Sequence, residues 1–153
     1  MTHAPVRLEL AADREAMVPL LLEADESEPV LRGYLHDGDL YRVMAGGEPV
    51  GAVLLIREGS DAVEIKNIAL WPAHRGGGLG RAAIEAVAAV ARTTGAARLL
   101  VGTADTSTGT IAFYRAVGFH DAGRLEGFFD VYPEPVVEGG LVAHDMVRFE
   151  MEL

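Results

Sequence analysis

The stretch RGGGLGR, residues 75–81, places four glycines between two arginines. It follows an apolar segment that ends at Trp71 and precedes an alanine-rich helical pattern. Glycine costs an ordered segment about 0.5–1 kcal/mol relative to alanine, so four of them indicate that the backbone itself is used here. Unpaired amide N–H groups that lead into a helix, together with the positive end of the helix dipole, bind anions. We therefore expect a phosphate or pyrophosphate at residues 76–81, with Arg75 and Arg81 adding positive charge.

Three known phosphate-binding loops compete for this stretch. The P-loop of nucleotide hydrolases requires Gly-Lys-Ser/Thr, and the sequence GRA at residues 80–82 excludes it. A dinucleotide fingerprint can be fitted to Gly78, Gly80 and Ala83, but too few residues follow for the usual two-half sheet. The third pattern, R/Q-x-x-G-x-G/A, is matched at every position of residues 75–80. It is the loop of the GNAT acetyltransferase superfamily, which this chain resembles.

The resemblance extends along most of the chain. Residues 64–80, EIKNIALWPAHRGGGLG, look like the central motif of the superfamily, and residues 110–119, TIAFYRAVGF, look like its second motif. The tail at residues 128–146, FFDVYPEPVVEGGLVAHDM, is similar to a small subgroup of uncharacterised bacterial members. One departure lies before the second-motif helix, where DTST at residues 105–108 replaces an asparagine that the superfamily often has. Polar contacts between that turn and a cofactor therefore do not follow from the resemblance.

Composition limits the class of protein. A chain of 153 residues, half of them hydrophobic, can form one domain, residues 1–153, with a buried core. The absence of cysteine excludes disulfides, cysteine nucleophiles and thiolate metal sites, and it fits the reducing cytoplasm. The apolar run MVPLLL at residues 17–22 is too short for a membrane span, so we expect a soluble protein. The formal charge of −10 opposes binding to nucleic acid or to anionic membranes and favours cationic small molecules as partners.

Hydrophobic periodicity predicts the order of the elements. We expect strands at residues 6–10, 40–45, 49–56, 62–71, 98–101, 123–132 and 141–152, and helices from Asp13 and at 29–35, 79–94 and 108–117. The strand at 49–56 is apolar without alternation, so both of its faces should be covered. One mixed sheet with helices on both faces, an α/β (α+β) architecture, is the economical arrangement. The resemblance implies the GNAT fold, a mixed, mostly antiparallel sheet of six to seven strands.

Acetyl-CoA is the cosubstrate that the resemblance implies. Its pyrophosphate is expected on the glycine loop, and its pantetheine arm is expected to pair, like an added strand, with the strand that ends at Trp71. The residues assigned in this way to acetyl-CoA are Ile68, Leu70, Arg75, Gly76, Gly77, Gly78, Leu79, Gly80 and Arg81. The alternative explanation for the glycines is a flexible loop.

Two residues are candidates for catalysis. Tyr114 lies where the superfamily commonly has a general acid for the leaving thiolate, and a phenol of ordinary pKa is protonated at pH 7. The alternative is a tyrosine that only packs in the core. Because an alkyl ammonium must lose a proton, at a cost of roughly 4 kcal/mol at pH 7, a base is needed as well. Glu64, eleven residues before Arg75, matches the spacing of the catalytic glutamate in some protein-lysine acetyltransferases of the superfamily. Its alternative is a surface ion pair with Lys66.

Other polar residues have less specific signals. Asp145 interrupts an otherwise apolar strand face, which favours a structural network over a place in the substrate cleft. The superfamily builds its acceptor pocket from regions that here contain Glu134, Glu138, Tyr34, His36 and Asp37. Solvated loop charges are the default explanation for each of these. His144 has no companion at metal-ligand spacing, so no metal site is expected.

These observations predict an acetyl-CoA-dependent N-acetyltransferase. The amine would attack the thioester directly, without a covalent acyl-enzyme, and a backbone N–H near Ile68 would stabilise the oxyanion. The expected acceptor is a small cationic amine, such as a polyamine or an antibiotic amino sugar. A protein N-terminus or lysine is the second expectation within this class. A non-catalytic acyl-CoA-binding module, which would not need Tyr114, is the alternative from another class, and a homodimer is left open.

Overall fold

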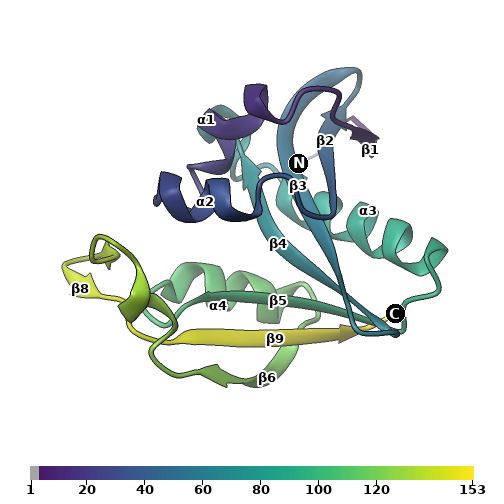
Figure 1. Ribbon diagram of the computed structural model, residues 1–153. Helices are drawn as coiled ribbons and strands as arrows, with labels where there is room; N and C mark the ends of the chain where they lie inside the picture. Colours follow the sequence, from purple (N-terminus) through teal and green to yellow (C-terminus); the bar gives the residue numbers. More distant parts are fainter. Residues whose placement is uncertain (1–3) are drawn as a thin grey trace.

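A computed structural model describes residues 4–153 and contains a seven-stranded sheet flanked by helices (Figure 1). In sheet order the strands are β1 (Val6–Leu10), β2 (Asp39–Ala45), β3 (Glu48–Glu58), β4 (Ala62–Leu70), β5 (Arg98–Ala104), β9 (Met146–Glu152) and β6 (His120–Leu125). Within the described residues β4 and β5 are the one parallel pair of this sheet, and all other neighbours are antiparallel. A small separate hairpin consists of β7 (Val137–Glu138) and β8 (Leu141–Val142). The mixed, mostly antiparallel sheet expected from the sequence is confirmed.

Helices cover both faces of this sheet. α3 (Leu79–Thr93) and α4 (Thr108–Ala116) pack with it into one hydrophobic core, and α1 (Val18–Leu21) and α2 (Glu28–Tyr34) contribute to a second core. Alternate residues of β3 enter the two cores: Val53 and Leu55 enter the first, and Ala52 and Leu54 enter the second. The two cores therefore lie on opposite faces of the sheet. This explains why β3 is apolar without alternation.

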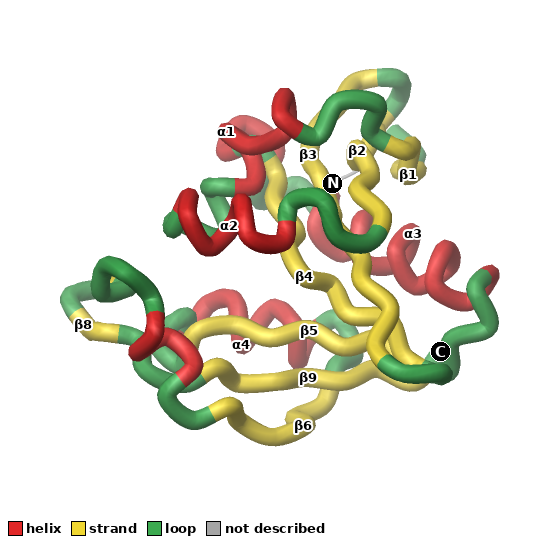
Figure 2. The backbone as a smooth tube through the Cα atoms, viewed as in Figure 1, coloured by secondary structure: helices red, strands yellow, loops and turns green. Residues whose placement is uncertain are grey.

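The parallel ladder between β4 and β5 is short. It pairs Ala62–Ile65 with Arg98–Val101 and does not continue beyond them. On the other side of β4, the register with β3 shifts by one residue at Lys66, which is the extra residue of a β-bulge. Past this bulge β4 and β5 diverge, as Figures 1 and 2 show. One edge of β4, over residues 66–70, is therefore left without a partner strand.

The C-terminal third differs from the expectation. The strand expected at residues 123–132 corresponds to β6, but it begins earlier, at His120, and its expected continuation beyond Leu125 is wrong, because a 3₁₀ helix, η3 (Phe128–Val131), follows. Gly127 enters η3 with a φ of 68°, a left-handed conformation that disfavours a continuous strand. Phe128, Phe129 and Tyr132 have high strand propensity, but their rings pack on one another, with centroids 5.0–6.2 Å apart.

The strand expected at residues 141–152 is interrupted at Asp145. β8 ends at Val142, and β9 begins only at Met146. The Asp145 carboxylate accepts the Gly127 N–H at 3.0 Å and Arg124 Nη2 at 3.0 Å. These bonds hold the pKa of Asp145 below its ordinary value, the Gly127 N–H having the largest effect. The structural network expected at Asp145 is therefore present.

The helix expected from Asp13 is also divided. A 3₁₀ helix, η1 (Glu15–Met17), is followed by the short α1, and Pro19 occupies the first turn of α1. Proline is accommodated in a first turn but not in a helix interior, so the chain restarts its helix at this point.

The contact between β3 and β4 yields a prediction about stability. A Cβ added to Gly51 would lie 2.5 Å from the Ala69 carbonyl oxygen, a backbone atom of the β4 ladder. We expect Gly51→Ala to lower the free energy of unfolding by about 1–3 kcal/mol, as overpacking does, when measured by urea denaturation. The control is Gly33→Ala in α2, where nothing lies within 4 Å of the added Cβ. It should raise stability by about 0.5–1 kcal/mol, and a loss as large as that of Gly51→Ala would contradict the argument.

Candidate active site

A cavity of about 600 Å³ lies where β4 and β5 diverge. Its walls come from the open edge of β4, the end of β5, the start of α4, the segment before α2 and the segment from η3 to β7. Distant segments meet here, since the Tyr132 hydroxyl donates to Asp25 Oδ2 at 3.4 Å. Four residues that the sequence assigned to the site line this cavity: Ile68, Leu70, Arg75 and Tyr114. The divergence of the strands therefore brings the predicted cofactor edge and the predicted acid to one place.

The glycine loop has the geometry of an anion site. Gly76 and Gly78 have φ values of 82° and 84°, in the left-handed region, and Gly78 is the N-cap of α3. Ala82 N–H donates to the Gly78 carbonyl, whereas the N–H groups of residues 76–81 find no acceptor in the described part of the chain. These amides lie at the positive end of a 15-residue helix. They can hold a phosphate or pyrophosphate.

Gly80 has a different structural role from Gly76 and Gly78, because it permits close packing of two helices. A Cβ there would lie 3.3 Å from two ring atoms of Phe113 in α4, closer than side chains usually pack. The missing side chain lets α3 and α4 approach each other. The motif thus combines left-handed turns at Gly76 and Gly78 with a helix–helix contact at Gly80, which the sequence alone did not separate.

The two arginines of the loop are bound to other protein groups. Arg75 donates from Nε to the Leu70 carbonyl at 3.0 Å and from Nη2 to Glu23 at 3.1 Å. Arg81 donates to the carbonyl of Ala116, the last residue of α4, at 3.1 Å. Their charges lie beside the loop, so the anion site itself is built from backbone amides.

Along the open edge of β4, the N–H and carbonyl groups of alternate residues point away from β3 and toward the cavity. Trp71 N–H donates to the Val50 carbonyl of β3 at 3.0 Å, whereas the Leu70 carbonyl turns the other way, toward Arg75. Backbone groups alternate in direction along a strand, so those of Ile68 point the same way as those of Leu70. An extended chain that carries amide groups can pair with this edge as an added strand.

Tyr114 lies at the boundary between the core and the cavity. It is 5% exposed and packs against Phe113, Phe119 and Phe149, with ring centroids 5.5, 5.5 and 6.0 Å away. Burial raises the pKa of its phenol above the ordinary value, so the hydroxyl keeps its proton through the neutral range. Over residues 4–153 this hydroxyl has no hydrogen-bond partner. A protonated and unengaged hydroxyl on the cavity wall has the chemistry of a general acid.

Glu64 is partly buried on β4 but does not line the cavity. Burial raises the pKa of its carboxyl group, and the charge of Lys66 acts in the opposite direction. The two side chains form no ion pair within the described residues, so the surface pair given above as the alternative is absent. A raised pKa suits a base, but Glu64 needs a bridging water to reach an amine in the cavity.

A network of hydrogen bonds near the bulge was missed by the sequence analysis. Asn67 Nδ2 donates to the Tyr34 hydroxyl at 3.0 Å, and that hydroxyl donates to Asp25 Oδ2 at 2.8 Å. Burial is the largest effect on the pKa of Tyr34 and raises it, the hydrogen bond from Asn67 lowers it, and the contact with Asp25 raises it. Asn67, an amide directly before the apolar residues Ile68, Ala69 and Leu70, was the one signal that could have indicated this network.

The acceptor-pocket candidates divide into two groups. Glu138 lines the cavity, and its carboxylate accepts the Ser107 hydroxyl at 2.8 Å. Four other candidates do not line it: Tyr34, His36, Asp37 and Glu134. Tyr34 still contributes indirectly, through its bond to Asp25.

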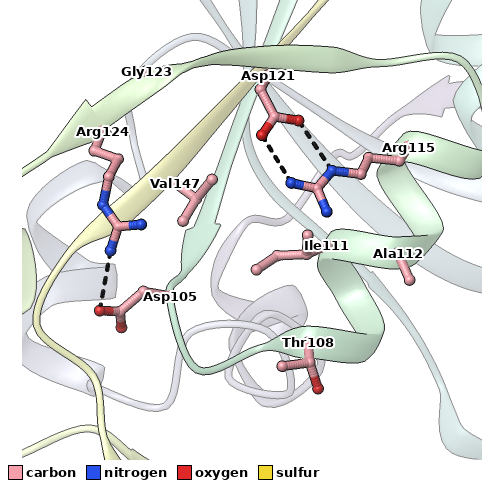
Figure 3. A pocket seen from close by; sticks show the side chains of 9 residues that line it. All are labelled: Asp105, Thr108, Ile111, Ala112, Arg115, Asp121, Gly123, Arg124 and Val147. Carbon is pink, nitrogen blue, oxygen red and sulfur yellow. Dashed lines mark hydrogen bonds and ion pairs between the residues drawn. The ribbon is translucent and has the colours of Figure 1, made fainter.

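A second hollow of about 440 Å³ lies between α4, β6 and β9 (Figure 3). Its two arginines are paired with acids: Arg115 binds Asp121 at 2.8 and 3.0 Å, and Arg124 lies 3.5 Å from Asp105. None of the predicted site residues lines it. With its charges neutralised in this way, it is a weaker candidate than the cavity at β4.

Residues 4–153 offer neither a metal site nor a membrane-spanning helix. No group of three or more histidines, aspartates and glutamates has a geometry that could bind a metal ion. Among the helices of the described chain, none has both the length and the apolar character needed to span a bilayer.

Comparisons with known proteins agree with one another. The family model described as "Acetyltransferase (GNAT) family" matches residues 9–119. The chain is 30% identical over 155 residues to the uncharacterized N-acetyltransferase YvbK of Bacillus subtilis, with all of both chains covered. A GNAT family acetyltransferase from Elizabethkingia anophelis, solved with acetyl-CoA bound, matches with a TM-score of 0.87 and 32% identity over 97% of each chain. A Bacillus subtilis acetyltransferase in complex with CoA matches with a TM-score of 0.86 and 31% identity, over 97% of this chain and 99% of that one.

The left-handed backbone at Gly78 yields a prediction about CoA binding. Alanine in this conformation costs about 1–2 kcal/mol, and the loop avoids that cost by moving its amides. We expect Gly78→Ala to weaken CoA binding about tenfold in isothermal titration calorimetry. The control is Gly59→Ala in the turn between β3 and β4, where φ is 67° and the surroundings are open. It should lower stability and leave CoA affinity unchanged, whereas wild-type affinity in the Gly78 variant would remove the loop from the site.

Proposed function

This chain belongs to the GNAT family of acetyltransferases, and on that basis we propose that it acetylates a primary amine of a small cationic molecule. Family membership makes it an acetyl-CoA-dependent acyltransferase. The roles of individual residues and the acceptor are our proposal. One observation carries it: the open edge of β4, Arg75 beside the glycine loop and the phenol of Tyr114 all line one cavity.

The residues present fit acetyl-CoA. The free amides of residues 76–81 would hold its pyrophosphate, and the open edge at Ile68 and Leu70 would hold its pantetheine arm through strand-like hydrogen bonds. Arg75 bonds the Leu70 carbonyl, so its positive charge lies at the junction of these two parts. Bound acetyl-CoA supplies the acetyl group as a thioester. A backbone N–H near Ile68, directed into the gap, would donate to the thioester oxygen as negative charge develops on it.

Tyr114 and Glu64 divide the proton transfers in this proposal. The acceptor arrives as an ammonium and must lose a proton before its nitrogen can form the new amide bond. Glu64, through water, would take that proton, supported by its raised pKa. Tyr114 would donate its phenolic proton to the sulfur as the C–S bond breaks and the thiol leaves, and it would regain a proton from the nitrogen, which loses its second proton as the amide forms. The products are an N-acetylated amine and a free thiol, without a covalent acyl-enzyme.

The cavity wall supports a small molecule as the acceptor. It carries four acids, namely Glu23, Asp25, Glu26 and Glu138, against two basic residues, Lys66 and Arg75. Negative charge next to the amine site favours an ammonium ion. The hydrogen bond from Tyr132 to Asp25 joins two separate segments of the cavity wall, which favours a small acceptor over a protein N-terminus or lysine.

Two further proposals concern the whole protein. We propose that residues 1–153 form one N-acetyltransferase domain, which is supported by a sheet whose strands come from Val6 to Glu152. We place the enzyme in the cytoplasm, because it has no cysteine and its charge of −10 suits a soluble protein. No nucleic acid or membrane partner is proposed. A homodimer stays a prediction, to be tested by measuring the oligomeric state in solution.

Substitution of Tyr114 tests the proposed function. A panel of primary amines is first screened by release of free thiol from acetyl-CoA, with an N-terminal peptide included. With the best amine, Tyr114→Phe should lower kcat at least about 100-fold, as loss of a general acid does, and should retain CoA affinity. Tyr41→Phe, on β2, is the control and should keep the wild-type rate. If no amine releases thiol, the enzyme proposal fails, and an unchanged kcat in Tyr114→Phe would remove the acid role.

Glu64→Gln separates a catalytic role from a structural one by pH. The raised pKa means that Glu64 stabilises the fold in its protonated form. This contribution is complete below the ordinary glutamate pKa of about 4.3 and is lost as pH rises through the folded-state value. A glutamine side chain stays neutral throughout. The thermal midpoint of the variant, measured relative to that of the wild type, should therefore increase as pH rises from about 4 to 8. If Glu64 is the base, Glu64→Gln should also lower kcat/KM at pH 7. A kcat/KM equal to that of the wild type would leave Glu64 with only the structural role.

A further inference from the structure

The single lysine of the chain lies in the active-site cavity. All other basic residues among the 13 are arginines, and Lys66 is the only lysine. It is the bulge residue of β4 and comes directly after the last residue that pairs with β5, so it lies where the cavity opens. Its side chain lines the cavity. A lysine ammonium is a compact charge with three hydrogen-bond donors on a flexible stem, which differs from the planar guanidinium used everywhere else in this chain.

The ammonium group of Lys66 is held by aromatic rings and forms no ion pair within the described residues, although its charge acts on Glu64 from a longer distance. Its Nζ lies 5.0 Å from the ring centroid of Tyr34 and 6.0 Å from that of Phe128. Nowhere in residues 4–153 does a carboxylate oxygen come within ion-pair distance of it. The residue is partly buried, so the charge has lost part of its hydration without gaining an ion pair. Aromatic contacts restrict where the ammonium lies but leave its donors free.

The other charges of the cavity wall are already engaged or have the opposite sign. Arg75, the second cation, binds Glu23 at 3.1 Å. Asp25 accepts the Tyr34 hydroxyl at 2.8 Å, a bond that fixes the position of its carboxylate in the wall. Lys66 is therefore the one cation of this wall, among the described residues, without an acid contact. The wall is bipolar, with a free ammonium at the bulge and carboxylates around it.

We propose that Lys66 binds a carboxylate of the acceptor, so that the acceptor is an amino acid or a related small molecule with both an amine and a carboxylate. This inference rests on the proposed function and narrows its substrate class. An acceptor with ammonium groups alone would be repelled by Lys66, and a phosphate dianion would be repelled by the surrounding acids. A zwitterion satisfies both kinds of charge. A basic amino acid also retains the net positive charge that the acidic wall favours.

Matched pairs of amines test this inference directly. Lysine and cadaverine differ only by a carboxylate, as do phenylalanine and phenethylamine. In at least one pair, the wild-type enzyme should acetylate the amino acid with a kcat/KM at least about tenfold above that for its decarboxylated partner. One hydrogen bond between charged groups provides a difference of this size. Lys66→Met should lower this ratio at least about tenfold. Lys66→Arg, which keeps the charge, should retain a preference for the amino acid.

Because Lys66 is the only lysine, binding can also be followed without turnover. Protein grown on lysine labelled with ¹³C at Cε gives one resonance for this residue. The resonance should shift saturably with the preferred amino acid and not with its decarboxylated partner at equal ionic strength. The inference would be overturned if the enzyme acetylated both members of every pair at equal rates. It would also be overturned if Lys66→Met left the ratio of kcat/KM between amino acid and decarboxylated partner unchanged. In both cases the proposed function would stand. A saturable amino-acid shift without thiol release from any amine would support the binding site and reject the enzymatic proposal.

Discussion

Four residue pairs hold β4 to β5, and the bulge at Lys66 then turns the next residues of β4 away from that neighbour. A sheet interior normally pairs every backbone N–H and carbonyl, because an unpaired buried group costs about as much as a lost hydrogen bond. β5 avoids this cost by pairing along its whole length with β9. β4 has no such second neighbour over residues 66–70, so its edge is available to a ligand. The cavity, the open edge and the position of Lys66 are all consequences of this one early end to a parallel ladder.

Backbone and side chains have different tasks in the site. Both surfaces assigned to acetyl-CoA, the amides of residues 76–81 and the edge of β4, consist of main-chain groups, and the loop arginines bind protein carbonyls instead. Main-chain recognition places few demands on side-chain identity beyond glycine where φ is positive. The acceptor end that we propose is lined by side chains, and these come from segments as far apart as Asp25 and Tyr132. Specificity for the acceptor can therefore vary while the donor site is preserved.

This division also explains how much of the protein could be predicted from its sequence. The glycine loop, α3 and the apolar strands have local signals, namely glycine spacing and hydrophobic period, and the structure agrees with them. Residues 126–132 were misassigned because strand propensity was outweighed by mutual packing of Phe128, Phe129 and Tyr132. The bulge at Lys66 is a register shift of a single residue, which has no local signature. The bonds that join Asp25, Tyr34 and Asn67 depend on the tertiary fold and could not be derived from periodicity.

Net charge and local charge act on the acceptor over different distances. A total of −10 sets the potential that an approaching molecule meets, but salt screens this potential over about 8–10 Å. Inside the cavity the nearest groups dominate, and there Glu23 is already paired with Arg75 while Lys66 has no acid in contact. The total charge alone favours a cationic acceptor and takes no account of Lys66. With the contacts included, the acceptor that we propose meets both kinds of charge: the acidic wall would attract its ammonium end, and Lys66, which has no acid contact among the described residues, would bind its carboxylate.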